Sequence, residues 1–340
     1  MAEISGLPPE ASYILPLRWS TDEGLSELVS YLDRLTGWID VILVDGSAEP
    51  LFQAHAKAFT RAVRHVRPQV RAGANGKVAA VMTGVALAQT ELLVLADDDV
   101  RYEGAPLRRV LSLLSDAEVV RPQNYFLTLP WHARWDTARS LINRAFSADF
   151  PGTLGVRRSA LVATDGYDGD VLFENLELLR TIRAAGGREL RANDVFVGRV
   201  PPSARHFLHQ RIRQAYDDFA QPRRLVFELS LLPAFLTAGY QAVRRHRPWW
   251  ALILLTAACT VAEAGRRKNA GRQVFSPSAA LWAPVWLVER SVCIWAAVVL
   301  RGTGGVSYSG SRLSLAAHSS KQLHAQHAGK IRSAQRREHP

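Results

Sequence analysis

The stretch Glu91-Leu-Leu-Val-Leu-Ala-Asp-Asp-Asp-Val100 runs from apolar residues into three consecutive carboxylates. A buried strand that ends at the functional edge of a sheet has this composition. Side chains alternate along an extended backbone, so Asp97 and Asp99 point to one side and Asp98 to the other. Two converging carboxylates suit a hard divalent cation, which could in turn hold a diphosphate. A solvated acidic turn after a core strand would have the same sequence.

Two further strand-like segments precede this stretch. Residues 12–17 form a short apolar run, leucine and valine recur at helical spacing from Leu25 to Gly37, and residues 39–44 form a second apolar run. Strand, helix and strand with short connections make a parallel unit, and ligands bind where its strands end. We therefore expect an α/β fold in which Asp45 lies beside the ligand.

The segment between these strands and the acidic stretch is expected to be mainly helical. Residues 51–66 are expected to form one helix, and residues 78–88 another that is rich in small residues. Between them, the turn Ala72-Gly-Ala-Asn-Gly-Lys77 places a lysine at a helix N-terminus, where phosphate groups bind well. Lys77 is therefore a candidate phosphate ligand, although most such turns bind nothing.

Beyond the acidic stretch the sequence predicts elements at 107–114 (helix), 119–120 (strand), 131–146 (helix) and 152–158 (a glycine-bearing loop). A helix then begins at Phe173 and ends at Gly186. Its N-terminal part carries Glu174 and Glu177, which share a face because they are three residues apart. Either is a candidate catalytic base, although acidic residues in a first turn commonly only balance the helix dipole.

The chain is basic, since its 340 residues include 42 Lys and Arg against 31 Asp and Glu, a formal net charge of +11. The partner indicated is a nucleic acid or an anionic membrane surface. Because the basic residues gather around apolar C-terminal segments and no nucleic-acid-binding motif is present, we expect a membrane partner and no nucleic acid. The two cysteines lie in apolar runs and support neither disulfides nor a metal cluster. Residues 1–10 do not resemble a secretory signal, so the N-terminal part is expected in the cytoplasm.

The C-terminal third contains three apolar stretches near the length that crosses a bilayer: 225–243, 249–264 and 279–300. Glu228 interrupts the first and Glu289-Arg290 the third, where unpaired charge is costly. All flanking loops are basic, which conflicts with three full crossings. We expect the first stretch in the cytoplasmic interface and the other two as a membrane hairpin. Three interfacial or buried helices of a soluble domain are the alternative.

The order of Asp45, Lys77, Asp97-Asp-Asp99, Glu174 and Gln210 resembles that of the family 2 glycosyltransferases with a GT-A fold. The chain is most similar to the membrane-associated branch that includes ceramide glucosyltransferases and polysaccharide synthases. The resemblance rests on order and spacing over about residues 12–220. It implies a Rossmann-like, mostly parallel sheet in residues 1–222, membrane-associated helices in 223–300 and a basic, flexible tail in 301–340.

The resemblance also implies roles for residues at the strand ends. Pro16 and Asp45 match positions that line the nucleotide pocket, and Lys77 matches the lysine of a Gly-Lys turn that approaches the nucleotide. Asp97 and Asp99 match the outer residues of an Asp-x-Asp motif. In the family this motif holds Mg²⁺ or Mn²⁺ on the diphosphate of the sugar nucleotide, so Asp97 also counts among the nucleotide-binding residues.

Two motifs depart from the family pattern. Gln210 and Arg213 match the Gln-x-x-Arg of a Gln-x-x-Arg-Trp motif that faces the leaving group, but Gln214 replaces the tryptophan. The Glu-Asp motif is here Glu174-Asn175, and an asparagine cannot be the base that the family's aspartate is. Either Glu174, which we prefer, or Glu177 takes this role, or the chemistry is altered, or the member is inactive.

The implied activity is inverting hexosyl transfer from a nucleotide-sugar, expected to be a UDP-sugar, to a lipid or glycan acceptor. It would occur at the cytoplasmic face of the cell membrane and serve glycolipid or polysaccharide synthesis. A polyprenyl phosphate acceptor would need no base. Two other classes stay open: a metal-dependent nucleotidyltransferase, which would release pyrophosphate, and an inactive membrane-anchored subunit that only binds nucleotide.

Overall fold

The computed structural model describes residues 11–308 and 311–328, which form two compact units. Within these residues unit 1 comprises 11–122, 151–197 and 317–328, and unit 2 comprises 123–150, 198–308 and 311–316. The division differs from the expected limits at 222 and 300, because each unit combines segments that are distant in sequence.

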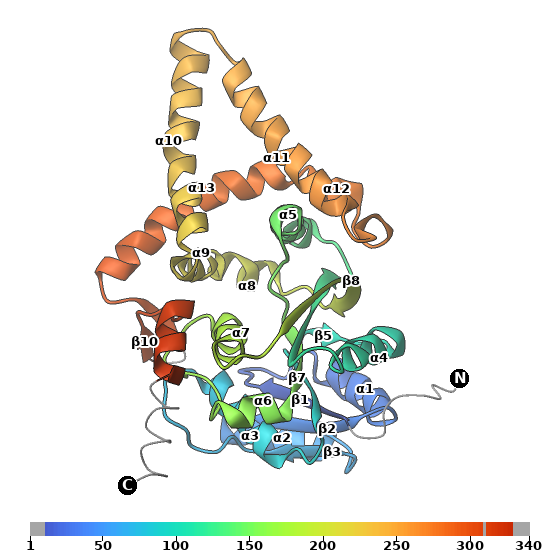
Figure 1. Cartoon of the computed structure of the whole chain (residues 1–340). Helices are drawn as coiled ribbons and strands as arrows, with labels where there is room; N and C mark the ends of the chain where they lie inside the picture. The colour runs from blue at the N-terminus through green and yellow to red at the C-terminus, as the bar shows by residue number, and fades with distance from the viewer. Residues whose placement is uncertain (1–10, 309–310, 329–340) are drawn as a thin grey trace. The chain divides into compact units, whose positions relative to one another are not determined.

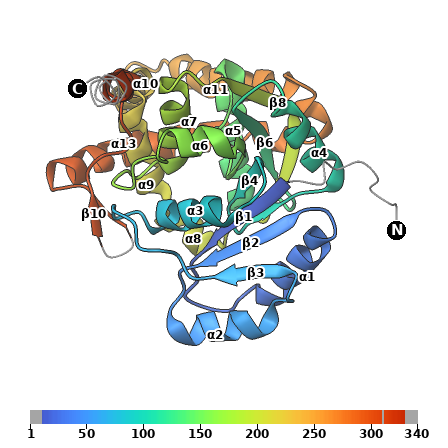
Figure 2. The ribbon, with the colours of Figure 1, turned by 60° about the horizontal axis from the view of Figure 1, so that its bottom comes forward.

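An eight-stranded sheet, most of which lies in unit 1, has the strand order β3-β2-β1-β4-β7-β6-β8-β5. Its strands are β1 (Ala11–Leu17), β2 (Asp40–Asp45), β3 (Val63–Val66), β4 (Leu92–Ala96), β5 (Val100–Arg101), β6 (Val119–Phe126), β7 (Thr153–Arg157) and β8 (Glu189–Arg199). The last residues of β6 and β8 belong to unit 2. β1, β2, β3 and β4 pair in parallel, and β7 pairs antiparallel with both β4 and β6. Figure 2 shows β1, β2 and β3 side by side. The expected α/β class with a mostly parallel sheet is confirmed.

Side-chain alternation divides the helices of unit 1 between the two faces of the sheet. These helices are α1 (Leu25–Thr36), α2 (Glu49–Ala58), α3 (Gly76–Leu87), α4 (Gly104–Leu113), α6 (Arg158–Ala163) and α7 (Glu174–Ala184). Tyr13 and Leu15 of β1 share one buried core with apolar residues of α1 and α4. Ile14 points the other way and contacts α3 at Gly84, where a Cβ atom would lie 2.3 Å from Ile14 Cγ2. Gly84 thus lets α3 pack directly on β1.

Two of the sequence-based predictions for unit 1 are wrong. The helix expected over 51–66 ends at Ala58, and Val63–Val66 is instead the edge strand β3, which pairs with β2. The loop expected over 152–158 contains the strand β7, which is inserted between β4 and β6. In both cases pairing with a distant strand overrides the local sequence preference.

Unit 2 is mainly helical (Figure 1). Its elements are α5 (Trp131–Phe146), α8 (Ala204–His209), α9 (Arg211–Tyr216), the 3₁₀ turns η1 (Asp217–Ala220) and η2 (Gly271–Gln273), α10 (Pro222–Arg244), α11 (Trp249–Arg267), α12 (Pro277–Ala280), α13 (Ala283–Gly302) and the hairpin of β9 (Val306–Tyr308) and β10 (Ser311–Leu313). A short turn joins α10 to α11, and α13 packs against α10. The charges inside the apolar helices are paired where these helices meet: Arg290 Nη1 lies 3.0 Å from Asp218 Oδ2 and 3.8 Å from Glu228 Oε2.

Two helical segments in the described part of the chain are long and apolar enough to cross a membrane, Pro222–Arg244 and Pro277–Gly302. α11 is not one of them, since its last turns carry Glu263, Arg266 and Arg267. Of the three expected stretches, the first and third thus have the length and hydropathy of a membrane span and the second does not. The membrane hairpin expected from the second and third stretches stays a prediction. Within the tail expected to be flexible, residues 306–308 and 311–313 form a β-hairpin and residues 320–328 are helical.

Candidate functional site

The acidic turn, Asp97 to Asp99, follows β4 at the edge where the parallel strands of unit 1 end. The backbone N–H of Asp97 donates to the carbonyl of Gly152 (2.8 Å), which ties the turn to the segment before β7. Lys77 Nζ lies 2.5 Å from Asp97 Oδ1. The structure therefore brings together two residues that the sequence predicted for one site, Lys77 and Asp97.

Lys77 owes its position to contacts between two loops. Asn75 caps α3 by accepting a hydrogen bond from the Lys77 backbone N–H (3.1 Å), and its amide donates to the carbonyl of Val171 (3.0 Å). The Asn75 backbone N–H donates to the carbonyl of Gly169 (2.8 Å). The loops touch most closely at Gly73, where a Cβ atom would lie 2.6 Å from the carbonyl carbon of Gly169. This contact sets the start of α3 beside the start of α7.

Glu174 is the first residue of α7 and is buried to 8% exposure. Its Oε1 accepts a hydrogen bond from Lys77 Nζ at 2.6 Å. Burial lowers the pKa of the Lys77 ammonium, but the Asp97 and Glu174 carboxylates outweigh it and raise that pKa well above its usual value. Lys77 is therefore a fixed cation shared by two carboxylates.

Glu177 takes no part in the contacts among Lys77, Asp97 and Glu174 and has a different partner. Its carboxylate is fully buried and accepts hydrogen bonds at 2.8 Å from both the backbone N–H and the Nδ1 of His318. Arg180 Nη1 in turn donates to the carbonyl of His318 (2.6 Å). Both oxygens of Glu177 thus hold the C-terminal segment on α7. Nothing in the sequence around Glu177 points to His318 as its partner.

Asp45 is fully buried and its carboxylate is saturated by neighbours in unit 1. Oδ1 accepts from the Ser47 backbone N–H (2.8 Å), while Oδ2 contacts His55 Nδ1 (2.6 Å) and His65 Nε2 (3.0 Å). Burial by itself would raise the pKa of Asp45, but the hydrogen bonds from His65, Ser47 and His55 hold it well below its usual range. In this arrangement the carboxylate organises the end of β2. Pro16, half-buried in β1, pairs in register with Val44.

The middle carboxylate of the acidic turn has a partner that the sequence did not indicate. The indole Nε1 of Trp19, a residue just after β1, donates to Asp98 Oδ2. Burial, followed by the charge of Asp99, raises the pKa of Asp98. The Asp98 side chain is thus bonded to the segment that follows β1.

Gln210 and Arg213 belong to unit 2. Gln210 joins α8 to α9 and its side-chain amide contacts His206 Nε2. The guanidinium of Arg213 lies over the ring of Tyr308, 4.8 Å from its centroid. Both are partly exposed, and they are three positions apart in the α8–α9 segment of that unit.

The donor set of the acidic turn fits a hard divalent cation bound together with a substrate. Within residues 11–308 and 311–328, no group of three or more His, Cys, Asp and Glu is arranged to hold a metal by itself. Mg²⁺ is usually held by one or two carboxylates plus substrate phosphates rather than by an all-protein cage. Asp97 and Asp99 supply such oxygens, with Lys77 already bound to one oxygen of Asp97.

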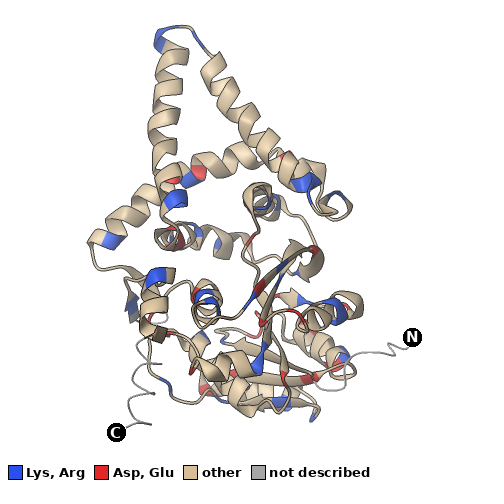
Figure 3. Ribbon diagram, in the orientation of Figure 1, with Lys and Arg blue, Asp and Glu red and all other residues tan. Residues whose placement is uncertain are grey.

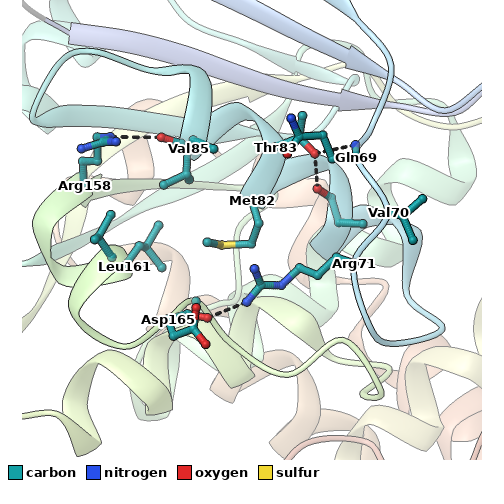
Figure 4. Close-up of a pocket in the computed structure, with 13 residues that line it drawn as sticks. Gln69, Val70, Arg71, Met82, Thr83, Val85, Arg158, Leu161 and Asp165 are labelled. Carbon is teal, nitrogen blue, oxygen red and sulfur yellow. Dashed lines mark hydrogen bonds between the residues drawn. The ribbon is translucent and has the colours of Figure 1, made fainter.

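A cavity of about 370 Å³ lies elsewhere in unit 1, between α3 and α6 (Figure 4). Its lining includes Met82, Leu161 and the arginines Arg71 and Arg158, and contains none of the predicted site residues. Arg71 donates to the carbonyl of Asp165 and Arg158 to that of Val85, so both guanidinium groups are tied to backbone. These bonds join the start of α6 and the turn after it to α3 and the loop before it.

Comparison with known proteins gives one family. Residues 26–154 match the model of glycosyl transferase family 2. This segment includes Asp45, Lys77 and the whole acidic turn. It ends before Glu174, Gln210 and Arg213. No match was found among curated proteins.

Solved structures resemble the chain only distantly. The mannosyltransferase PcManGT from Pyrobaculum calidifontis, solved with GDP-Man and Mn²⁺, is 18% identical with a TM-score of 0.49, covering 86% of each chain. A mycobacterial protein of known crystal structure is 16% identical with a TM-score of 0.39, covering 58% of this chain and 70% of its own. Neither likeness bears on the ligands of this chain.

Proposed function

We propose that this protein is an inverting glycosyltransferase that moves a sugar from a nucleotide-sugar to an acceptor at a membrane surface. The proposed donor is a UDP-sugar. The observation that carries the proposal is the cluster of Lys77, Asp97 and Glu174. It stands where the parallel strands end, which is where α/β sheets bind ligands, and two of its members lie in the segment that matches the family model.

Each of the proposed site residues has its own part in the reaction. Asp97 and Asp99 would hold Mg²⁺ or Mn²⁺, which when bound offsets the charge of the donor's diphosphate. Glu174 accepts the proton of the acceptor hydroxyl as that oxygen bonds to the anomeric carbon. The bond from this carbon to the diphosphate breaks, and the nucleoside diphosphate leaves with the electron pair. Gln210 and Arg213 are the proposed donors to the leaving group.

Glu174 is a better base than Glu177 on the geometry. Both oxygens of Glu177 are occupied by His318, and its carboxylate is fully buried. Glu174 keeps one carboxylate oxygen outside its bond to Lys77. Asn175 donates to the carbonyl of Pro151 (3.3 Å), a structural contact that requires no carboxylate. These contacts support Glu174 as the substitute for the family's aspartate.

The acceptor is proposed to be a membrane lipid, or a glycan made at the membrane, because unit 2 exposes a continuous apolar face. One side of the α12–α13 segment carries exposed residues at intervals of three and four: Leu281, Val285, Val288, Val292, Trp295 and Val299. Figure 3 shows no charged residue over the middle of α10 and the first turns of α11, with arginines at the turn between them. An apolar face bordered by basic residues fits a bilayer with anionic headgroups. We place unit 1 at the cytoplasmic side of the cell membrane.

The test is release of nucleoside diphosphate from a panel of sugar nucleotides by membranes that contain the protein, with Mn²⁺ or Mg²⁺ and with chelator. We expect metal-dependent release that Asp99→Ala abolishes. Glu174→Gln should lower transfer to hydroxyl acceptors by about 100- to 10,000-fold while nucleotide binding persists. An unchanged Glu174→Gln rate would point to an acceptor that is already ionised, such as a lipid phosphate.

Two results would contradict the proposal and indicate another function. Release of pyrophosphate would indicate a nucleotidyltransferase. Nucleotide binding without turnover on any donor or lipid extract would indicate a binding subunit.

A further inference from the structure

The acidic turn is held at Asp98 by two residues. Trp19 Nε1 donates to the Asp98 carboxylate, and Arg101 Nη1 donates to the Asp98 carbonyl at 2.6 Å. Arg101 is itself held by the carboxylate of Glu27, with Nε to Oε1 at 2.8 Å. Side chain and backbone of Asp98 are thus both fixed, by groups from different elements.

Trp19 is in turn fixed to the strand ends. Its backbone N–H donates to Ser47 Oγ at 2.9 Å, and the Ser47 backbone N–H donates to Asp45 Oδ1 at 2.8 Å. The indole ring meets the His55 ring edge to face at a centroid distance of 5.8 Å. A continuous set of contacts therefore runs from the end of β2, through Trp19, to the acidic turn after β4.

We infer that Trp19 is a positioning residue for the acidic turn. By donating to the Asp98 carboxylate, its indole N–H fixes the turn that carries Asp97 and Asp99, the two carboxylates proposed to bind a cation together with the donor's diphosphate. The inference rests on the proposed function, because that function gives the two carboxylates their ligand. It assigns a role to Trp19 that composition and spacing did not indicate.

The test measures Mn²⁺ affinity directly, by the electron paramagnetic resonance signal of free Mn²⁺, with the full-length protein and a non-hydrolysable sugar nucleotide. Trp19→Phe removes the indole N–H and keeps an aromatic ring. We expect about tenfold weaker Mn²⁺ binding, as for loss of one hydrogen bond to a charged group. Trp38→Phe is the matched control, because Trp38 belongs to the same unit and packs partly buried against its core. It should bind like the wild type.

Combining Trp19→Phe with Asp98→Ala distinguishes a role of Trp19 that acts through Asp98 from any other role. If Trp19 acts through Asp98, adding Trp19→Phe to Asp98→Ala has no further effect on Mn²⁺ affinity. An equal loss in both backgrounds would overturn the inference, as would wild-type affinity in Trp19→Phe. Should Trp19→Phe fold poorly, 3-benzothienylalanine at position 19 replaces the N–H by sulfur at nearly the same shape, and the same loss is expected.

The two hypotheses fail in different ways. A wild type that binds Mn²⁺ and nucleotide but is insensitive to the Trp19 substitutions refutes the positioning role and leaves the proposed function intact. A wild type with no Mn²⁺ binding and no turnover refutes both.

Discussion

Lys77 Nζ lies 2.6 Å from Glu174 Oε1, although the two residues are 97 positions apart in sequence. The same nitrogen lies 2.5 Å from Asp97 Oδ1. One ammonium group therefore joins the start of α7 to the acidic turn. Removing it would leave two carboxylates close together without their shared cation, a costly arrangement for partly buried groups.

Lys77→Met should lower the turnover of the proposed transfer by about 100- to 1,000-fold, the usual effect of removing one preorganised electrostatic partner from an active site. The measurement is the kcat for nucleoside diphosphate release at saturating donor and metal. Lys57→Met is the control, because Lys57 is exposed on α2 of the same unit. Near-normal turnover in Lys77→Met would remove Lys77 from the site.

Asp45→Asn should destabilise the protein by about 3 kcal/mol at neutral pH, since it weakens several hydrogen bonds to a buried charge. The pKa of Asp45 is depressed in the folded state, so its contribution is present above the unfolded value of about 3.9 and is lost as pH falls below it. Urea unfolding of wild type and variant between pH 3 and 7 should show the difference shrinking at the acid end. A constant difference would contradict this account.

The local sequence pattern was sufficient for some elements. The strand before the acidic turn lies where its continuous apolar run predicts it. The helix Trp131–Phe146 also lies at the predicted residues, although its buried face includes polar residues such as Asp136 and Arg144. The sequence order also selected Lys77, Asp97 and Glu174, which the fold then brings together. These three residues lie close together because of the strand order and because two loops are in contact.

Partners that come from distant segments could not be predicted in the same way. Asp45 was expected to face the nucleotide, but whether a strand-end carboxylate meets a ligand or two histidines depends on residues ten and twenty positions later. The indole of Trp19 bonds to a carboxylate 79 positions away in sequence. The imidazole of His318 bonds to one 141 positions away. Such pairs carry no periodic signal. The strands β3 and β8 were missed because pairing with distant strands, rather than local sequence preference, determines that they are strands.

His318→Leu should destabilise unit 1 by about 1–3 kcal/mol, because it leaves the fully buried carboxylate of Glu177 without one of its two donors. His318→Asn is the matched variant, since its side-chain amide can donate from nearly the place of Nδ1 and should restore most of the loss. Urea unfolding followed by circular dichroism measures both. Equal destabilisation by Leu and Asn would show that the hydrogen bond to Glu177 is not what holds the C-terminal segment.

The exposed apolar face of α13 makes a prediction about membranes. Val288 and Val292 are 49% and 57% exposed on one side of that helix, while Arg290 between them is buried and paired. Val288→Asp and Val292→Asp together should release the protein from anionic liposomes in a sedimentation assay. Each charge placed in the apolar layer costs up to about 3 kcal/mol, whereas in water it costs little and leaves the fold intact.

Val162→Asp is the control for this membrane test, because Val162 is 54% exposed on α6 of unit 1, outside the proposed membrane face. It should bind liposomes as the wild type does. If the α13 double variant also stays bound, raising the salt concentration decides what holds it: release by salt would assign binding to the basic residues between α10 and α11. Binding that survives both the double variant and high salt would contradict a role for the α13 face, because neither its apolar contact nor the surface charge would then be required.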